Sequence, residues 1–502
     1  MIDALVEPVP TTLPLPYLEE FLVVPVEIGD EVVRVATALD LDLATEDEIA
    51  AAFERRVDRV YAPRAEILDA LRRFYGAAGE ELDVVVQGGF DADGMPDEDA
   101  DPANLEDLAN QAPVIRLVNF LILEAGRRRA SDIHFEALED SLKVRYRIDG
   151  RLQEVTTPPK KLQAAITSRI KIMAEMNIAE RRLPQDGRVR LRVGERDLDL
   201  RISTLPTLHG ESVVMRLLDK GGARLDLEEL GMDGPTLERF ERLIGAPHGV
   251  LLVTGPTGSG KTTTLYAALE RLNAQENKIL TVEDPVEYQL AGVNQVPVKA
   301  KIGMTFARAL RHILRQDPDI VMVGEMRDFE TAEIAIQAAL TGHLVFSTLH
   351  TNDAPTAVTR LVEMGIEDYL VASAVNGILA QRLVRTLCPA CAVETVADPA
   401  ELARLLGPDA RTGDLPSRPR VRSPGGCAAC EGSGYRGRTG IYELLTLDDE
   451  LRARIPERSA AALRDLGRAR GMLTLREDGW RKVRQGITSV DEVLRVTREE
   501  EA

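Results

Sequence analysis

Between residues 131 and 218, apolar residues recur at every second position over several short stretches. The alternation is clearest in residues 143–148 and 197–202, and it is typical of strands that bury one face. A helix is expected near residues 160–178, and another begins at Pro113. We therefore expect an antiparallel sheet backed by the helix near residues 160–178.

The pattern changes after Gly245, where short apolar runs alternate with helix-like segments. Strands followed by helices are typical of a parallel sheet, because each crossover between parallel strands needs a long connection. The tail from about residue 445 has a mostly helical pattern. The second half of the chain is therefore predicted to be an α/β domain with a helical tail.

Residues 1–90 have the pattern of a small separate module. Residues 23–36 form two β-rich runs joined at Gly29 and Asp30, which indicates a hairpin. Thr45 and Glu48 have the spacing of a capping box at the start of a helix. The apolar face of that helix is expected to contain Ile49, Phe53 and Val57. This segment predicts an α+β module.

The stretch from Gly88 to Asn110 contains glycine, proline and many acids, with few apolar side chains to bury. Like charges along such a segment repel one another, and no core would hold it in place. We therefore expect a flexible acidic linker after the N-terminal module.

The composition limits the class of protein. With 502 residues, of which 44% are hydrophobic and 29% charged, the chain fits a globular protein of roughly two to four domains. A formal net charge of -20 argues against binding to nucleic acid or to an anionic membrane surface. Aromatic residues make up 4%, which is too few to indicate a base-stacking platform. Proteins are therefore the expected partners.

Membrane insertion and export are not indicated by the sequence. No run approaches the roughly 18 to 20 uncharged apolar residues of a membrane-spanning helix. The first residues also lack a basic start followed by an apolar core. We therefore expect a cytoplasmic protein.

The clearest motif is Gly-Pro-Thr-Gly-Ser-Gly-Lys-Thr, which ends at Lys261 and Thr262. It lies between the apolar run 250–253 and the helix-like residues 263–272, as a phosphate-binding loop requires. Lys261 is expected to reach the β- and γ-phosphates of ATP, and Thr262 to hold Mg²⁺. The predicted cradle is Gly255, Pro256, Thr257, Gly258, Ser259, Gly260, Lys261 and Thr262.

Two further apolar runs lead into acids. Residues 279–282 precede Glu287, and residues 320–323 precede Glu325. Ligands of open α/β sheets bind at the carboxyl ends of the strands, so both acids are expected near the phosphates. One can support the metal and the other can orient the attacking water, whereas the alternative is a pair of solvated loop acids. The first segment also contains Glu283 and Asp284.

His343 and His350 flank residues 344–349, an apolar run that we expect to be a central strand of the same sheet. One histidine of the pair is a candidate sensor of the γ-phosphate. The alternative is a histidine whose hydrogen bonds are satisfied within the core.

The four cysteines form two Cys-x-x-Cys pairs separated by 35 residues, Cys388 and Cys391 followed by Cys427 and Cys430. So few cysteines cannot form a disulfide scaffold in a chain of this length. Two such pairs have the spacing of a tetrahedral Zn²⁺ site. The sequence therefore predicts that these four residues bind zinc.

Taken together, these motifs resemble those of the secretion and pilus traffic ATPases, from about residue 112 to residue 497. The matching segments are residues 281–288 (the family's aspartate box), 317–328 (its Walker B region), 341–353 (its histidine box), 182–188 and 130–136. The resemblance implies a homo-hexameric ring. Each subunit would have a sheet-rich half and a RecA-like half, with ATP bound between them.

Roles for single residues also follow from the resemblance. Lys261 and Thr262 would bind phosphate and Mg²⁺, Glu287 would position or activate water, and Glu325 would support the metal. Of the two histidines, His343 would be the phosphate sensor.

Arg188 and Arg201 match arginines that the family directs at a nucleotide, within one subunit or across a subunit boundary. The alternative for both is a surface pairing with Asp186 or Asp199.

The expected architecture is multidomain α/β. A RecA-like P-loop core would follow a sheet-rich, PAS-like α+β domain, with a small N-terminal α+β module and a zinc-binding insert. The expected parts are 1–90, a partner-docking module; 91–111, the linker; 112–222, the sheet-rich half; and 223–502, the RecA-like domain, with the insert at 386–432 and the helical tail at 445–502.

The length and the single N-terminal module resemble the type II secretion branch, whose motors drive pseudopilus assembly at the inner membrane. The implied partners are an inner-membrane docking protein, which would contact residues 1–90, and a polytopic platform protein. A pilus-assembly ATPase is the nearest alternative, and a nucleic acid translocase is the alternative of another class. Tandem motifs that would suggest cyclic dinucleotide binding are not evident in residues 1–90.

Overall fold

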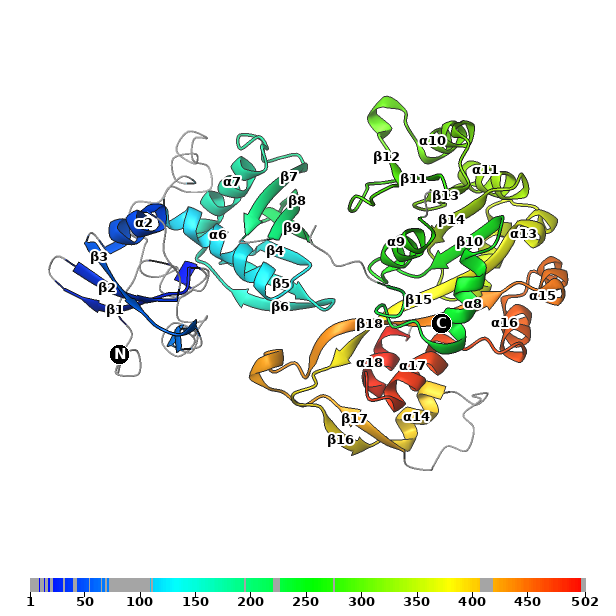
Figure 1. Cartoon of the computed structure of the whole chain (residues 1–502). Coiled ribbons are helices and arrows are strands. Elements are labelled where there is room, and N and C mark those ends of the chain that lie inside the picture. The colour runs from blue at the N-terminus through cyan, green and yellow to red at the C-terminus, as the bar shows by residue number, and fades with distance from the viewer. Residues whose placement is uncertain are drawn as a thin grey trace. The chain divides into compact units, whose positions relative to one another are not determined.

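The chain divides into two compact units, Met1–Gly221 and Gly222–Ala502. Figure 1 shows the computed structural model of the chain. The residues that the structure describes are 9, 13, 17, 18, 21–29, 32–38, 43–53, 55–64, 66, 67, 70, 71, 109, 112–193, 196–219, 226–273, 276–406 and 419–497. Almost all of the predicted acidic linker lies outside these residues.

The N-terminal module contains a three-stranded sheet in the order β1-β2-β3. Its elements are β1 (Val23–Ile28), β2 (Val32–Thr37), α2 (Leu43–Phe53) and β3 (Arg56–Tyr61). β1 and β2 are antiparallel and form the predicted hairpin, whereas β2 and β3 are parallel and are connected through α2. Ile49 and Phe53 lie in the module's apolar core.

Two details of the N-terminal prediction are wrong. α2 begins at Leu43, so Thr45 lies inside the helix instead of capping it. Val57 belongs to β3 and not to the helix. The Thr45 and Glu48 spacing matches a capping box by chance, because both residues lie within a helix that begins earlier.

The sheet-rich half contains a six-stranded antiparallel sheet in the order β6-β5-β4-β9-β8-β7. Its strands are β4 (Asp132–Ala137), β5 (Leu142–Ile148), β6 (Arg151–Thr156), β7 (Gln185–Val193), β8 (Arg196–Thr207) and β9 (Gly210–Asp219). Two helices, α6 (Ala112–Arg127) and α7 (Gln163–Met173), pack on the buried side of the sheet. The prediction of an antiparallel sheet backed by a helix is confirmed.

The second unit is built on a seven-stranded sheet in the order β12-β11-β13-β14-β10-β15-β18 (Figure 1). All neighbours are parallel except β15 and β18. The strands are β10 (Gly249–Thr254), β11 (Ile279–Glu283), β12 (Asn294–Pro297), β13 (Ile320–Val323), β14 (Leu344–Leu349), β15 (Val375–Leu387) and β18 (Tyr435–Thr446). The predicted α/β fold is confirmed.

Helices cover both faces of this sheet. One apolar core packs α8 (Gly234–Ile244) and α9 (Lys261–Leu272) on one face. The other core contains α10 (Phe306–Ile313), α11 (Phe329–Leu340), α12 (Ala354–Glu363) and α13 (Asp368–Ala374). Because β10 is central and buried on both faces, the loop that follows it is held on a rigid support.

The last part of the chain packs beside β15 and β18. It includes a two-stranded ribbon of β16 (Val393–Val396) and β17 (Arg420–Ser423), with the helices α14 (Pro399–Leu406), α15 (Asp449–Arg454), α16 (Ala460–Ala469), α17 (Leu475–Arg484) and α18 (Val490–Val496). A buried ion pair joins β15 to α18, with Arg385 Nη2 2.8 Å from Glu492 Oε2. The predicted helical tail is thus an integral layer of the second unit.

Candidate functional site

The phosphate-binding loop connects β10 to α9. Gly258 and Gly260 have φ angles of +80° and +86°, in the region that favours glycine. A Cβ atom on Gly255 would lie 2.5 Å from the carbonyl oxygen of Gln381, so a side chain cannot fit there. Ser259 is buried, and its hydroxyl has no hydrogen-bond partner among the described residues. The backbone therefore curls as a phosphate cradle requires.

Lys261 is the first residue of α9, and it folds back over the loop. Its ammonium donates hydrogen bonds to the carbonyl oxygens of Gly255, at 2.7 Å, and Pro256, at 3.0 Å. Burial lowers the pKa of Lys261 to about 8, while the charge of Glu325 opposes this shift and that of Arg382 adds to it. Thr262 follows as the second residue of the helix. A poorly solvated cation thus lies at the centre of the loop.

Glu325 lies at the same edge of the sheet. β13, which it follows, is parallel to both β11 and β14, so the carboxyl ends of these strands lie together. Arg327 Nη2 lies 2.7 Å from one carboxylate oxygen of Glu325, and His350 Nε2 lies 3.6 Å from the other. The structure therefore brings Glu325 and His350 within electrostatic reach of Lys261.

The two histidines lie at opposite ends of β14, and which of them senses phosphate stays a prediction. The parallel pairing of β10 and β14 aligns Gly249 with Leu344, so His343 lies beside the amino end of β10. Its Nδ1 is 2.9 Å from the carbonyl oxygen of Ala338. His350 follows the carboxyl end of β14 and is the histidine beside Glu325. Burial, followed by the charge of Lys261, lowers the pKa of His350.

Glu283 and Glu287 have different surroundings on the acidic loop after β11. Glu283 is buried, and it accepts hydrogen bonds from the hydroxyl groups of Thr281, at 2.5 Å, and Tyr266. Glu287 is half-buried in the loop that follows. Asp284 is exposed, and its charge adds to the effect of Glu325, whose hydrogen bond is the main cause of the raised pKa of Arg327. A fixed buried carboxylate therefore precedes the acid predicted to orient water.

The predicted arginines lie in the first unit, as direct cross-strand neighbours on β7 and β8. Arg188 Nε donates to Asp199 at 2.5 Å, and its Nη2 donates to the second carboxylate oxygen. Asp199 is buried, whereas 48% of the Arg188 side chain is exposed. The pairing with Asp199 is present, and it holds Arg188 in place while part of the guanidinium faces solvent. A role for Arg188 and Arg201 toward a nucleotide stays a prediction.

Two residues at the phosphate loop were not predicted. Gln381 and Arg382, on β15, lie beside the loop because β15 pairs with β10. The Gln381 side-chain oxygen accepts a hydrogen bond from Thr264 on α9 at 2.7 Å. Arg382 Nη2 donates to the carbonyl oxygen of Asn352 at 3.1 Å. More than a hundred residues separate them from the motif, so no local pattern marks them.

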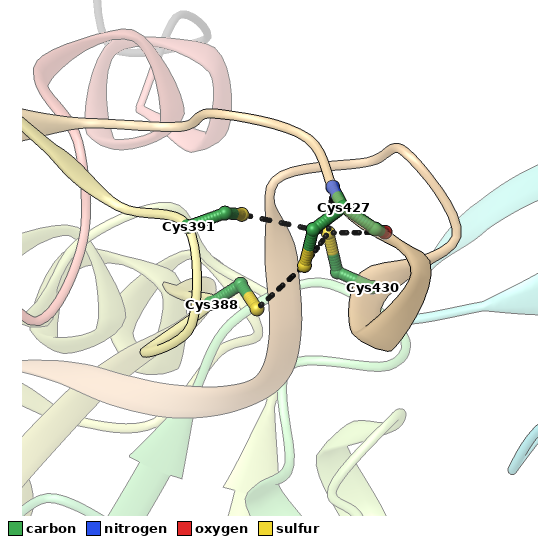
Figure 2. A group of neighbouring side chains, drawn as sticks. All are labelled: Cys388, Cys391, Cys427 and Cys430. Carbon is green, nitrogen blue, oxygen red and sulfur yellow. Dashed lines mark hydrogen bonds between the residues drawn. The ribbon is translucent and has the colours of Figure 1, made fainter.

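The four cysteines form one cluster, with all sulfur atoms within 4.8 Å of one another (Figure 2). Sulfur distances are 3.9 Å between Cys388 and Cys427, and 3.7 Å between Cys391 and Cys430. A tetrahedral site with Zn–S bonds of about 2.3 Å requires sulfurs about 3.8 Å apart. The cluster therefore fits a zinc ion.

A phosphate loop and strand-end acids on a RecA-like sheet define a P-loop ATPase. The chain belongs to the type II/IV secretion system protein family, whose model matches residues 107–495. A second model, the MshEN domain, matches residues 2–81. In the part of the chain that the structure describes, no helix is both long and apolar enough to cross a membrane.

Individual relatives agree with this assignment. The chain is 54% identical to the type II secretion system protein E of Xanthomonas campestris over 87% of this chain and 76% of the relative. It is 47% identical to the type IV pilus assembly ATPase PilB of Myxococcus xanthus over 96% of this chain and 85% of that protein. The crystal structure of the pilus retraction motor PilT with bound ADP has a TM-score of 0.51 and 26% identity, covering 76% of this chain and 96% of PilT.

Proposed function

We propose that this chain is the ATPase that powers type II protein secretion, by driving pseudopilus assembly at the cytoplasmic face of the inner membrane. The observation that carries the proposal is the meeting of Lys261 and Glu325 at the carboxyl edge of one parallel sheet. The likeness to type II secretion system protein E supports the choice of process. The working form would be a homo-hexamer.

The residues at this edge divide the chemistry between them. Lys261 and the loop amides would hold the phosphates of ATP. Bound Mg²⁺ would neutralise charge on the β- and γ-phosphates, with Thr262 and Glu325 as the residues that support it. Glu287 would orient the attacking water. In place of His343, His350 would sense the γ-phosphate, because it lies beside Glu325.

Arg188 and Arg201 would add positive charge to the nucleotide from the sheet-rich half, within one subunit or across a subunit boundary. The half-exposed guanidinium of Arg188 supports this role, since Asp199 holds it without covering it. Charge placed in advance by such a pair would stabilise the transition state for phosphoryl transfer.

The four-cysteine cluster would bind one Zn²⁺ as a structural site. Its sulfur distances support this, and the donor set has no open position for a reacting ligand. The ion would close the connection between β15 and β18, the two strands that carry the insert.

Residues 1–90 would dock on the cytoplasmic part of an inner-membrane secretion protein, and a polytopic platform protein would be the second partner. The separate family match over residues 2–81 supports an independent module. Motion of the nucleotide-binding part would then be transmitted to the membrane through this module.

The enzymatic part of the proposal is tested with two variants of the full chain. Lys261→Ala is expected to weaken nucleotide binding itself, because it removes the cation at the phosphates. Glu287→Gln is expected to bind nucleotide normally and to lose turnover, because it keeps the side-chain volume but cannot accept a proton. Binding is measured with a fluorescent nucleotide and turnover by phosphate release. Turnover in Glu287→Gln equal to that of the wild type would show that the water-orienting residue is another one.

A pilus-assembly motor is the second candidate, supported by the similarity to PilB over 96% of this chain. Both motors would use the same chemistry, so the membrane partner separates them. Residues 1–90 are mixed with the purified cytoplasmic domain of the docking protein from each system. Binding to the pilus protein alone would replace the secretion assignment.

A further inference from the structure

A buried tyrosine joins the phosphate-loop helix to the acidic loop after β11. Tyr266 lies on α9, and 0% of its surface is exposed. Its hydroxyl donates a hydrogen bond to Glu283, the last residue of β11. The backbone N–H of Glu287 lies 3.4 Å from the same hydroxyl oxygen and donates to it. One hydroxyl group therefore contacts both ends of the segment from Glu283 to Glu287.

Gln295, on β12, supports the same loop from the other side. Its side-chain nitrogen lies 3.1 Å from Glu283 Oε1, 3.3 Å from the Tyr266 hydroxyl oxygen and 3.1 Å from the carbonyl oxygen of Tyr288. Its side-chain oxygen accepts a hydrogen bond from the N–H of Leu290 at 2.8 Å. The loop is thus tied to the side chains of Tyr266 and Gln295 along its length.

The donor and acceptor roles in this cluster are fixed by burial. Only 3% of Glu283 is exposed, and a buried carboxylate is stable only when donors surround it. Burial, and then the hydrogen bond to Glu283, raise the pKa of Tyr266, so its hydroxyl keeps its proton and donates it. The ring of Tyr266 also packs edge-on against Tyr288, with 4.6 Å between ring centroids. Hydroxyl and ring therefore contact different parts of the same loop.

From this geometry we infer that Tyr266 is a positioning residue for ATP hydrolysis, which with Gln295 holds Glu287 at a fixed place relative to the phosphate loop. Lys261 and Tyr266 both lie on α9. The helix that carries the phosphate-binding cation therefore also holds the loop that carries the water-orienting acid. Hydrolysis is sensitive to displacements of about 1 Å at the reacting centre. This inference rests on the proposed role of Glu287 in turnover.

The test is Tyr266→Phe in the full chain, which keeps the ring packing and removes only the hydroxyl. The expected result is a kcat reduced by about ten- to a hundredfold, with the nucleotide Kd within about twofold of wild type. Hydrogen–deuterium exchange of the 284–293 amides should become faster, because the Glu287 N–H loses its acceptor. Tyr435→Phe is the matched control, since it removes another buried hydroxyl, 2.7 Å from Ser489, beside the cysteine cluster.

Gln295→Met provides a second test that does not depend on how Tyr266→Phe folds. It should lower kcat in the same direction and also speed exchange in the 284–293 loop. Wild-type kcat and wild-type exchange in both variants would overturn the inference, as would an equal loss in Tyr435→Phe. A wild-type chain that binds but never hydrolyses ATP would instead refute the proposed function.

Discussion

Nucleotide affinity should fall as the pH rises from 7 to 9, because Lys261 changes its charge in that interval. Only 9% of Lys261 is exposed, and burial lowers the pKa of its ammonium to about 8. The protonated form donates charge-assisted hydrogen bonds to phosphate, and the neutral amine does not. Binding of a nucleotide must therefore be accompanied by proton uptake above pH 8.

The size of the effect follows from the pKa. With a pKa of about 8, roughly nine-tenths of Lys261 is protonated at pH 7 and roughly one-tenth at pH 9. The Kd should therefore rise about tenfold, which corresponds to about 1.4 kcal/mol. His350 does not add to this slope, since its pKa is lowered from its usual value and it is neutral throughout the interval.

Calorimetric titration of the wild type with ADP and Mg²⁺ at pH 7, 8 and 9 measures this slope. Repeating each titration in two buffers with different ionisation enthalpies reports the protons taken up. Lys261→Ala serves as the control, and it should bind weakly with no pH dependence in this range. A flat wild-type profile, or an equal slope in Lys261→Ala, would refute the reasoning.

Two further predictions concern the metal and the histidines. The purified chain should contain about one zinc per chain, and a strong chelator should remove it and lower the Tm by several degrees, since metal binding contributes folding energy. Metal analysis with a thermal melt checks this, and an unchanged melt after complete zinc loss would contradict it. His350→Ala should lower kcat by at least about tenfold, whereas His343→Ala should stay within about twofold of wild type. The reverse order in a phosphate-release assay would restore His343 as the sensor.

The sequence predicts best what is local or periodic. The phosphate loop is contiguous, so its strand, turn and helix can be recognised together, and the two-residue alternation marks the antiparallel sheet. Glu325 lies within electrostatic reach of Lys261 because parallel strands share a carboxyl edge, and a place for Glu287 beside the phosphates stays a prediction. The same rule also favours His350, which follows its strand, over His343, which precedes it. The family resemblance favours His343 instead, and the role of either histidine stays a prediction.

Contacts between distant segments could not be predicted. Arg382 and Gln381 lie beside the phosphate loop because β15 is the neighbour of β10. The order of strands in a sheet cannot be predicted from a local sequence pattern. Tyr266 looks like an ordinary core residue of an amphipathic helix, and only the fold brings Gln295 and Glu283 to its hydroxyl. Thr45 shows the opposite kind of error. The residues around it have the local pattern of a helix start, but the helix begins earlier, at Leu43.

β15 runs from the phosphate-binding loop to the cysteine cluster. Gln381 and Arg382 lie beside the phosphate loop, and Cys388 comes directly after the last residue of the strand. Six residues of extended chain span about 20 Å, and β18 pairs with β15 as far as Leu387. A displacement of the cysteine cluster would therefore move one end of the strand whose other part lies beside the phosphate-binding loop.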